Sequence, residues 1–163
     1  MAEFIKGQQL RTLVKGNQVV KTALTLPATT TGTLFTVSGG AVLVTSFFGV
    51  VSTATGATAT TLSIGTAPTV GTAKTAGLAT AQAITSLEAG TWIGLQPASV
   101  VTNTYTIGSL AVSGATSAGN VIFDVPDFTV AAGTITWTTN ATDTGAVSWY
   151  ITYVPLDTGA SVA

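Results

Sequence analysis

Residues 35–51, FTVSGGAVLVTSFFGVV, constrain the fold most, because they form the most apolar stretch of the chain and carry no charge. Gly39 and Gly40 divide the stretch, and two glycines can adopt the positive φ values that a tight two-residue hairpin turn requires. β-branched residues and phenylalanine fill the part after the glycines, which is typical of a strand. We therefore expect strands over residues 33–37 and 41–51, joined as a central hairpin.

The second of these strands has two apolar faces. Strict alternation puts one set of side chains on one face, namely Val42, Val44, Ser46, Phe48 and Val50. It puts the other set on the opposite face, namely Leu43, Thr45, Phe47, Gly49 and Val51. A half-buried antiparallel strand should have one polar face. We therefore expect one face to pack on the core, and a second subunit or the N-terminal segment to cover the other. The predicted oligomer interface is the set Leu43, Thr45, Phe47 and Val51.

A membrane-spanning helix is the alternative for so apolar a stretch, since about 18 consecutive apolar residues suggest one. Here Ser38, Thr45, Ser46 and several glycines interrupt the stretch, and no basic residue flanks it. The pattern therefore favours a buried strand and no contact with a membrane.

Composition excludes several kinds of chemistry. The chain has 163 residues, enough for one domain, and only 7% of them are charged, against about 25% in an average domain. Few charges and many Thr and Val residues fit an all-β protein whose surface lies against partners. The chain contains neither cysteine nor histidine. Thiol nucleophiles, Ser-His-Asp triads and His/Cys zinc sites are therefore excluded.

The basic residues gather at the start of the chain. Residues 1–21 carry a net charge of +3 and the remainder a net charge of −4, and four of the five basic residues are Lys6, Arg11, Lys15 and Lys21. A basic segment on an acidic body predicts docking on an acidic surface. Nucleic acid is not expected as a partner, because this segment has a single aromatic residue, Phe4, and no arginine cluster. The alternative interpretation is that residues 1–21 form a solvated tail without a partner. We divide the chain into an extended basic arm, residues 1–21, and a β domain, residues 22–163.

Further short strands alternate with turn signals along the rest of the chain. They are expected at residues 21–26, 58–64, 91–95, 105–112, 121–125, 134–138 and 146–154. Residues 72–85 contain good helix formers around Gly77, so a short helix is an option there. About eight to ten strands without a βαβ alternation predict an antiparallel β-sandwich that is jelly-roll-like.

No group of side chains gives a convincing catalytic or metal site. Asp124 and Asp127 flank Pro126, which is typical of a turn rather than of a catalytic pair. Residues 140–145, NATDTG, offer oxygen ligands for calcium but fit an Asx or glycine turn better. Trp92, Trp137 and Trp149 could line a sugar-binding cleft, although tryptophan in strands more often belongs to the core. We expect no enzymatic activity, no cofactor and no metal.

Two segments resemble parts of small virion proteins of tailed bacteriophages. Residues 149–160, WYITYVPLDTGA, with the preceding Thr144 and Gly145, are similar to the C-terminal end of those proteins. Residues 35–44, FTVSGGAVLV, and 48–51, FGVV, are similar to a segment that recurs in them. Together these segments cover about a fifth of the chain. The resemblance implies a capsid decoration (cement) or head-fibre protein, commonly oligomeric and often trimeric.

These observations lead to one expected function and two alternatives. The expected function is capsid decoration: a homo-oligomer, expected to be a trimer, stabilises the shell while Lys6, Arg11, Lys15 and Lys21 grip the major capsid protein. The start of the chain lacks the long apolar core of a signal peptide, so we expect synthesis in the host cytoplasm and a final place on the capsid surface of the virion. The alternatives are a tail or baseplate protein that binds host glycan through Trp92 or Tyr105, and a main capsid jelly roll.

Overall fold

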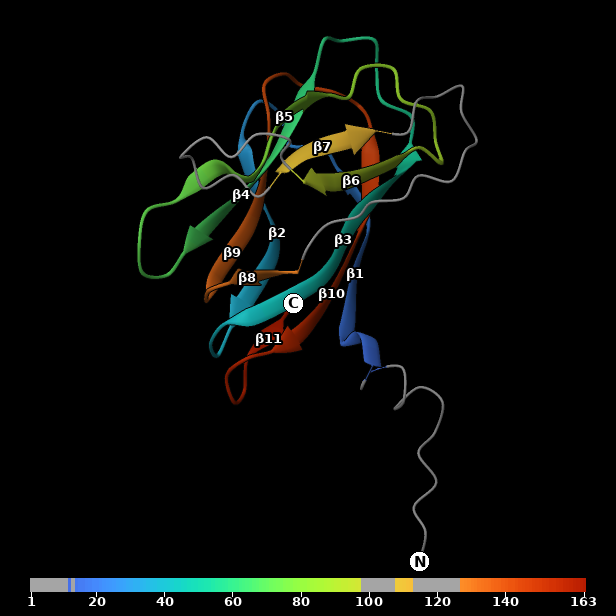
Figure 1. Ribbon diagram of the computed structural model, residues 1–163. Helices are drawn as coiled ribbons and strands as arrows, with labels where there is room; N and C mark the ends of the chain where they lie inside the picture. Colours follow the sequence, from blue (N-terminus) through green and yellow to red (C-terminus); the bar gives the residue numbers. More distant parts are fainter. Residues whose placement is uncertain (1–11, 13, 98–107, 113–126) are drawn as a thin grey trace, which may run out of the picture.

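The computed structural model describes residues 12, 14–97, 108–112 and 127–163 of the chain, and the described part is all-β (Figure 1). The strands in chain order are β1 (Asn17–Thr25), β2 (Thr31–Ser38), β3 (Val42–Thr53), β4 (Thr61–Pro68), β5 (Lys74–Ala83), β6 (Trp92–Pro97), β7 (Gly108–Val112), β8 (Phe128–Val130), β9 (Gly133–Thr139), β10 (Ala146–Pro155) and β11 (Ser161–Val162). This confirms the all-β class that the sequence predicts.

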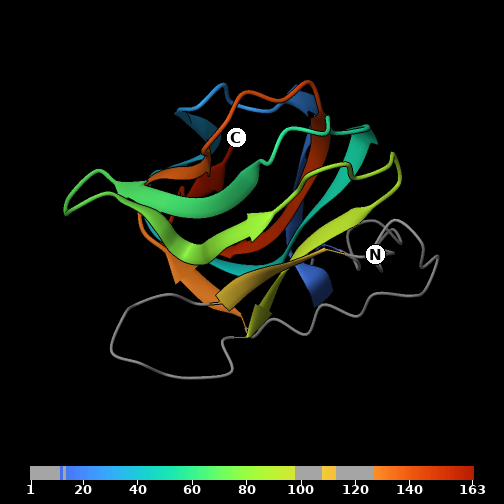
Figure 2. The same cartoon turned by 90° about the horizontal axis from the view of Figure 1, so that it is seen from above.

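The strands form two packed layers, which confirms the predicted antiparallel β-sandwich (Figures 1 and 2). One layer has the order β1-β10-β3-β6-β7, with β8 paired to the beginning of β3, and the other has the order β11-β2-β9-β4-β5. The strand pairs are antiparallel except β5 with β7, a parallel pair that joins the two layers along one side. The strands at the opposite ends of this path are β1 and β11.

Alternating apolar residues build the core between the layers. The strongest alternation that the sequence shows, in β10, turns one set of side chains inward: Val147, Trp149, Ile151 and Tyr153, all buried. Ile135 and Trp137 of β9, which alternate with threonines in the sequence, are buried from the other layer. Each large apolar side chain that is removed from water contributes about 1.5–3 kcal/mol. The inner faces of the two layers therefore hold the sandwich together.

The predicted central hairpin is wrong. β2 pairs with β9 and β11, whereas β3 pairs with β10, β6 and β8. Gly39 and Gly40 do adopt positive φ values, +73° and +138°, but their turn carries the chain from one layer to the other. Both flanking strands have an apolar face, and these faces meet across the core, where the rings of Phe35 and Phe47 pack edge to face at 6.2 Å. A local turn signal does not decide which strand becomes the hydrogen-bonded neighbour.

Two other segments also differ from the predictions. Residues 74–83 form strand β5 rather than a helix, because pairing with β4 satisfies their backbone and outweighs their weak helix propensity. Register shifts in the β4–β5 pair accommodate the extra residues around Gly77. The predicted boundary between residues 21 and 22 falls inside β1, which already pairs with β10 at Asn17. The strand predicted at residues 121–125 lies outside the described residues.

Candidate interaction surface

A bulge in β3 decides which of its side chains face outward. Ser46 lies opposite Thr152 of β10, and Val44 lies opposite Tyr153, so Thr45 is an extra residue in β3 and the alternation reverses there. Before the bulge Leu43 is outward; after the bulge Phe48 and Val50 are outward. Each of the two sets predicted by strict alternation therefore faces the core on one side of the bulge and the outer surface on the other.

This reversal corrects the predicted interface set. Phe47 and Val51 are only 3% and 1% exposed, because they pack in the core of the protomer itself. Leu43 and Thr45 lie on the outer side of the same strand and are half-buried. Phe47 and Val51 are thus unavailable to a second subunit, whereas Phe48 and Val50 replace them on the outer side.

A row of stacked rings crosses the outer side of this layer. Tyr150 of β10 lies directly opposite Phe48 of β3, and their rings stack with centroids 4.9 Å apart and planes 10° apart. The ring of Trp92 in β6 stacks on Phe48 from the other side, at 5.1 Å and 19°. Phe48 is therefore covered on both ring faces. We call Tyr150, Phe48 and Trp92 the outer aromatic row.

Apolar side chains extend this row over the outer side of β1, β10, β3 and β6. Val20, Trp92 and Val154 are 42%, 44% and 39% exposed. We call the whole set the outer apolar face; it consists of Val20, Leu43, Phe48, Val50, Trp92, Tyr150 and Val154. The remaining outward residues of these strands for which side chains are described are uncharged, as in Gln18, Ser46 and Thr152. An exposed apolar patch that crosses several strands is typical of a surface that binds another molecule.

The predicted basic docking residues do not lie together in the described part of the chain. Lys15 is exposed and lies just before β1, on the outer side. Lys21 is half-buried and lies opposite Trp149, whose side chain faces the core. The structure therefore places these two on different sides of β1. Lys6 and Arg11 lie outside the described residues.

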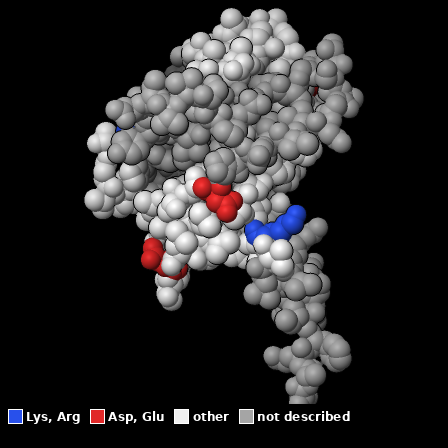
Figure 3. Space-filling view, viewed as in Figure 1, with Lys and Arg blue, Asp and Glu red and all other residues white. Residues whose placement is uncertain are grey.

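A groove of about 640 Å³ lies at the Lys15 end of the outer apolar face. Its lining comes from the segment before β1 and from β1, β3, β10 and the residue before β8: Val14, Lys15, Gly16, Gln18, Thr45, Ser46, Phe48, Asp127, Thr152 and Val154. The Thr45 hydroxyl donates to the carbonyl oxygen of Lys15 at 3.0 Å, which ties the segment before β1 to the bulge in β3. Figure 3 shows basic and acidic side chains near one another in the described part of the surface, with uncharged surface next to them. We call this hollow the outer groove.

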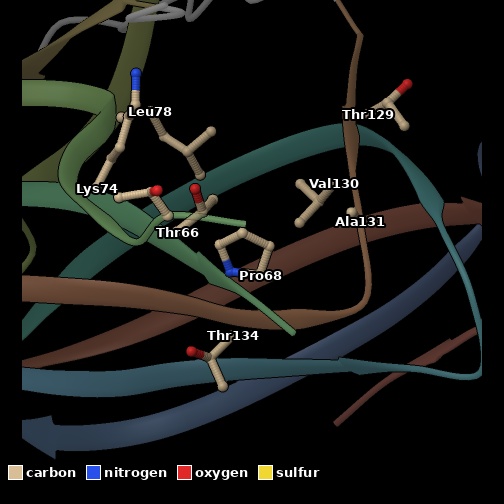
Figure 4. Close-up of a pocket in the computed structure, with 10 residues that line it drawn as sticks. Thr66, Pro68, Lys74, Leu78, Thr129, Val130, Ala131 and Thr134 are labelled. Atoms are coloured by element: carbon tan, nitrogen blue, oxygen red, sulfur yellow. The ribbon is translucent and has the colours of Figure 1, made fainter. Parts of the chain in front are cut away.

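A second hollow, of about 440 Å³, lies between β4 and β5 on one side and β8 and β9 on the other (Figure 4). Lys74 and Leu78 of β5 line it together with Val130 of β8, and threonines supply most of its polar groups. Its described lining includes no carboxylate, so it offers no acid–base pair for catalysis.

Asp143 is a structural carboxylate that joins two loops. Its Oδ1 atom accepts hydrogen bonds from the backbone N–H groups of Gly56, at 2.6 Å, and Gly145, at 3.1 Å, and its Oδ2 atom accepts one from the hydroxyl of Thr60, at 3.1 Å. Burial raises the pKa of Asp143, but these hydrogen bonds outweigh burial, and the pKa lies below its ordinary value. This loop, residues 140–145, is thus the turn that the sequence indicates.

The other carboxylates and the tryptophans differ in their roles. Asp157 accepts a hydrogen bond from the backbone N–H of Ala41, at 2.7 Å, and so holds the turn between β2 and β3. Asp127 is exposed in the outer groove, and its predicted partner Asp124 lies outside the described residues. Within the described ranges no three carboxylates gather as metal ligands would. Trp137 and Trp149 are core residues, whereas Trp92 is not.

Sequence reasoning missed the outer aromatic row because no local pattern shows that the strand of Tyr150 pairs with the strand of Phe48. The only available signal was that Phe47–Phe48 and Trp149–Tyr150 place two aromatic residues in succession, one for each side of a strand.

The described part of the chain has no helix with the length and apolarity to span a membrane. Comparisons with protein-family models, curated proteins and solved structures find no match to this chain.

Proposed function

We propose that the chain is a non-enzymatic capsid decoration (cement) protein of a tailed bacteriophage. It associates with further copies of itself, as a trimer, through the outer apolar face, and it binds the major capsid protein on the surface of the virion. Synthesis takes place in the host cytoplasm, and neither nucleic acid nor membrane is a partner. Bound to the assembled shell and not to free capsid subunits, such a protein stabilises the shell by mass action.

The outer apolar face is the observation that carries this proposal. Three of its side chains, Val20, Trp92 and Val154, are more than a third exposed, and they lie on three different strands. Water next to such a surface is released when a second surface covers it, at about 25 cal/mol for each Å² of apolar area. A layer that is apolar on both sides is therefore suited to a protein that works by association.

The strand order supports a jelly-roll assignment, which agrees with a virion protein. A jelly roll is a double-sheet fold of about eight strands, and viral capsid domains are among those that use it. Here β1, β10, β3 and β6 form one set of neighbours and β2, β9, β4 and β5 the other. Strands that follow one another in the chain, such as β1 and β2 or β2 and β3, lie in different layers, as the winding of a jelly roll requires. Fold alone does not give function, so this point is secondary.

The basic residues at the start of the chain are assigned to docking on the shell. A direct test is the full chain with Lys6, Arg11 and Lys15 replaced by glutamine; Lys21 is retained because it belongs to β1. We expect weaker binding to bare phage heads and a shallower dependence of binding on salt. The control variant Lys74→Gln removes one positive charge from β5, away from the start of the chain, and should bind as the wild type does. Equal binding by the triple variant would contradict the docking role.

Location on the virion tests the function as a whole. Gold-labelled antibodies against the chain should decorate the heads of virions that contain it, at several sites on each head. A tail or baseplate protein that binds the host is the second candidate, and the exposed Trp92 favours it because an aromatic ring at a surface often contacts a partner. Labelling confined to the tail would support this second candidate and contradict capsid decoration.

A further inference from the structure

The outer groove combines polar and apolar side chains in a way that the outer apolar face does not. At about 640 Å³ it has the size of a site for a small ligand. It lies on the side of Phe48 that leads to the beginning of β3, whereas Trp92 stacks on Phe48 next to β6. The groove and the outer apolar face therefore share two side chains, Phe48 and Val154, whereas Trp92 does not line the groove.

The polar side chains of the groove include both hydrogen-bond donors and acceptors. The Gln18 amide and the hydroxyls of Ser46 and Thr152 can each donate and accept, the Asp127 carboxylate only accepts, and the Lys15 ammonium only donates. Gln18, Lys15 and Asp127 are exposed, so a ligand reaches them without a rearrangement of the fold. A ligand with many hydroxyl groups, each of which donates and accepts, matches such a lining.

The charges of the lining argue for a neutral ligand. Among the described lining residues Lys15 is the one base and Asp127 the one acid, so their charges offset each other. A phosphorylated or sulfated ligand would meet the carboxylate of Asp127, and a metal cation would find a single carboxylate where several are needed.

Apolar contacts come from the edge of the groove. Val14 and Val154 are exposed there, 73% and 39%. Tyr150 and Trp92 cover both faces of the Phe48 ring, so a ligand meets the edge of that ring and cannot stack on it. The C–H groups of a sugar ring suit these contacts, while the polar side chains set its orientation.

We propose that the outer groove binds a neutral oligosaccharide, with Asp127 and Gln18 as the residues that hold its hydroxyl groups. Binding by one copy would be weak, because the groove offers few aromatic contacts and is open to water. If the chain decorates a capsid as proposed, many copies on one head would raise the apparent affinity through multivalency. The site itself does not require that location.

NMR titration of the full-length, ¹⁵N-labelled chain with cellohexaose and with maltohexaose tests this site. We expect saturable shifts of the amide signals of Gln18, Ser46 and Thr152 with at least one of these neutral hexasaccharides. Asp127→Asn and Gln18→Ala should each weaken binding by about tenfold, the loss that one hydrogen bond to the ligand produces. The control variant Val70→Ser, at an exposed position between β4 and β5 that does not line the groove, should bind as the wild type does.

Three outcomes would overturn the proposed site. The first is that neither hexasaccharide produces saturable shifts; the second is that Asp127→Asn binds like the wild type while its spectrum shows an intact fold. The third is tighter binding of a sulfated hexasaccharide in low salt, which would show an anion site. Because the oligomeric state is measured separately, failure of the sugar site leaves the proposed association through the outer apolar face standing.

Discussion

Two sets of aromatic rings lie on the inner and the outer side of the layer that contains β3 and β10, and they differ in burial and in ring geometry. On the inner side Phe47 packs against Trp149 at 5.3 Å, and Trp149 meets Trp137 edge to face at 6.0 Å. On the outer side the rings of Tyr150, Phe48 and Trp92 stack nearly parallel. The inner rings are enclosed by the second layer, whereas Trp92 is 44% exposed. Neighbouring residues of one strand thus stabilise the fold on the inner side and, as we propose, bind another copy on the outer side.

The enclosed set should dominate stability, so the largest expected effect is that of Phe47→Ala. Removal of this ring leaves a cavity between the layers and should lower the free energy of unfolding by about 3–5 kcal/mol. The matched variant Phe48→Ala, one residue further along, should cost only about 1–2 kcal/mol, because it loses two stacked contacts at a half-buried position. Urea unfolding followed by tryptophan fluorescence measures both. Equal losses would remove the distinction between the two sets.

The outer set should instead dominate association. Phe48→Asp introduces a charge into the middle of the outer apolar face and should weaken self-association by at least about a hundredfold, as loss of a central interface residue does. Val70→Asp is the control, because Val70 is 90% exposed between β4 and β5, away from this face. Sedimentation equilibrium over a range of concentrations gives both association constants. Dissociation of both variants, or of neither, would contradict the assignment of the face.

Asp143 supplies a pH dependence that belongs to the loops and not to either aromatic set. Its pKa is lowered in the folded chain, so it contributes stability above its unfolded pKa of about 3.9, and this contribution disappears as the pH falls through the lower folded value. At neutral pH Asp143→Asn should cost about 1–3 kcal/mol. The difference between wild type and variant in urea unfolding should shrink as the pH falls below about 5. A difference that stays constant with pH would show that the charge is not what matters.

The smallest expected effect concerns the coupling of two outer rings. A double-mutant cycle with Phe48→Ala and Tyr150→Ala, made at a concentration where the chain is monomeric, should give a coupling energy of about 0.5–1.5 kcal/mol. The stacking geometry of 4.9 Å and 10° is the reason for this expectation. A coupling energy of zero would mean that the outer aromatic row is not ordered before association.

Particular residues show how far the sequence could predict this structure. The alternation in residues 146–154 and 134–138 identified the inward residues of β10 and β9, because each strand keeps its period of two. In β3 the extra residue Thr45 reverses the alternation of inward and outward side chains. No local signal marks this bulge, because Thr and Ser are common in regular strands as well. Gly39 and Gly40 correctly indicated a turn. They did not indicate that the turn leads from one layer to the other, because the strands that pair with β2 and β3 lie far along the chain. The bulge at Thr45 also explains why Phe47 and Val51 were wrongly predicted to face a second subunit, because a one-residue shift exchanges the inner and outer faces of a strand.

Spin labels offer the most direct test of the central claim that copies of this chain meet through the outer apolar face. The chain has no cysteine, so Val20→Cys and Val70→Cys each provide a single labelling site, one on this face and one between β4 and β5. At concentrations where the chain self-associates, we predict that the label at residue 20 becomes immobilised and shows dipolar coupling to a second copy, while the label at residue 70 stays mobile. A mobile, uncoupled label at residue 20 in the associated state would contradict the account.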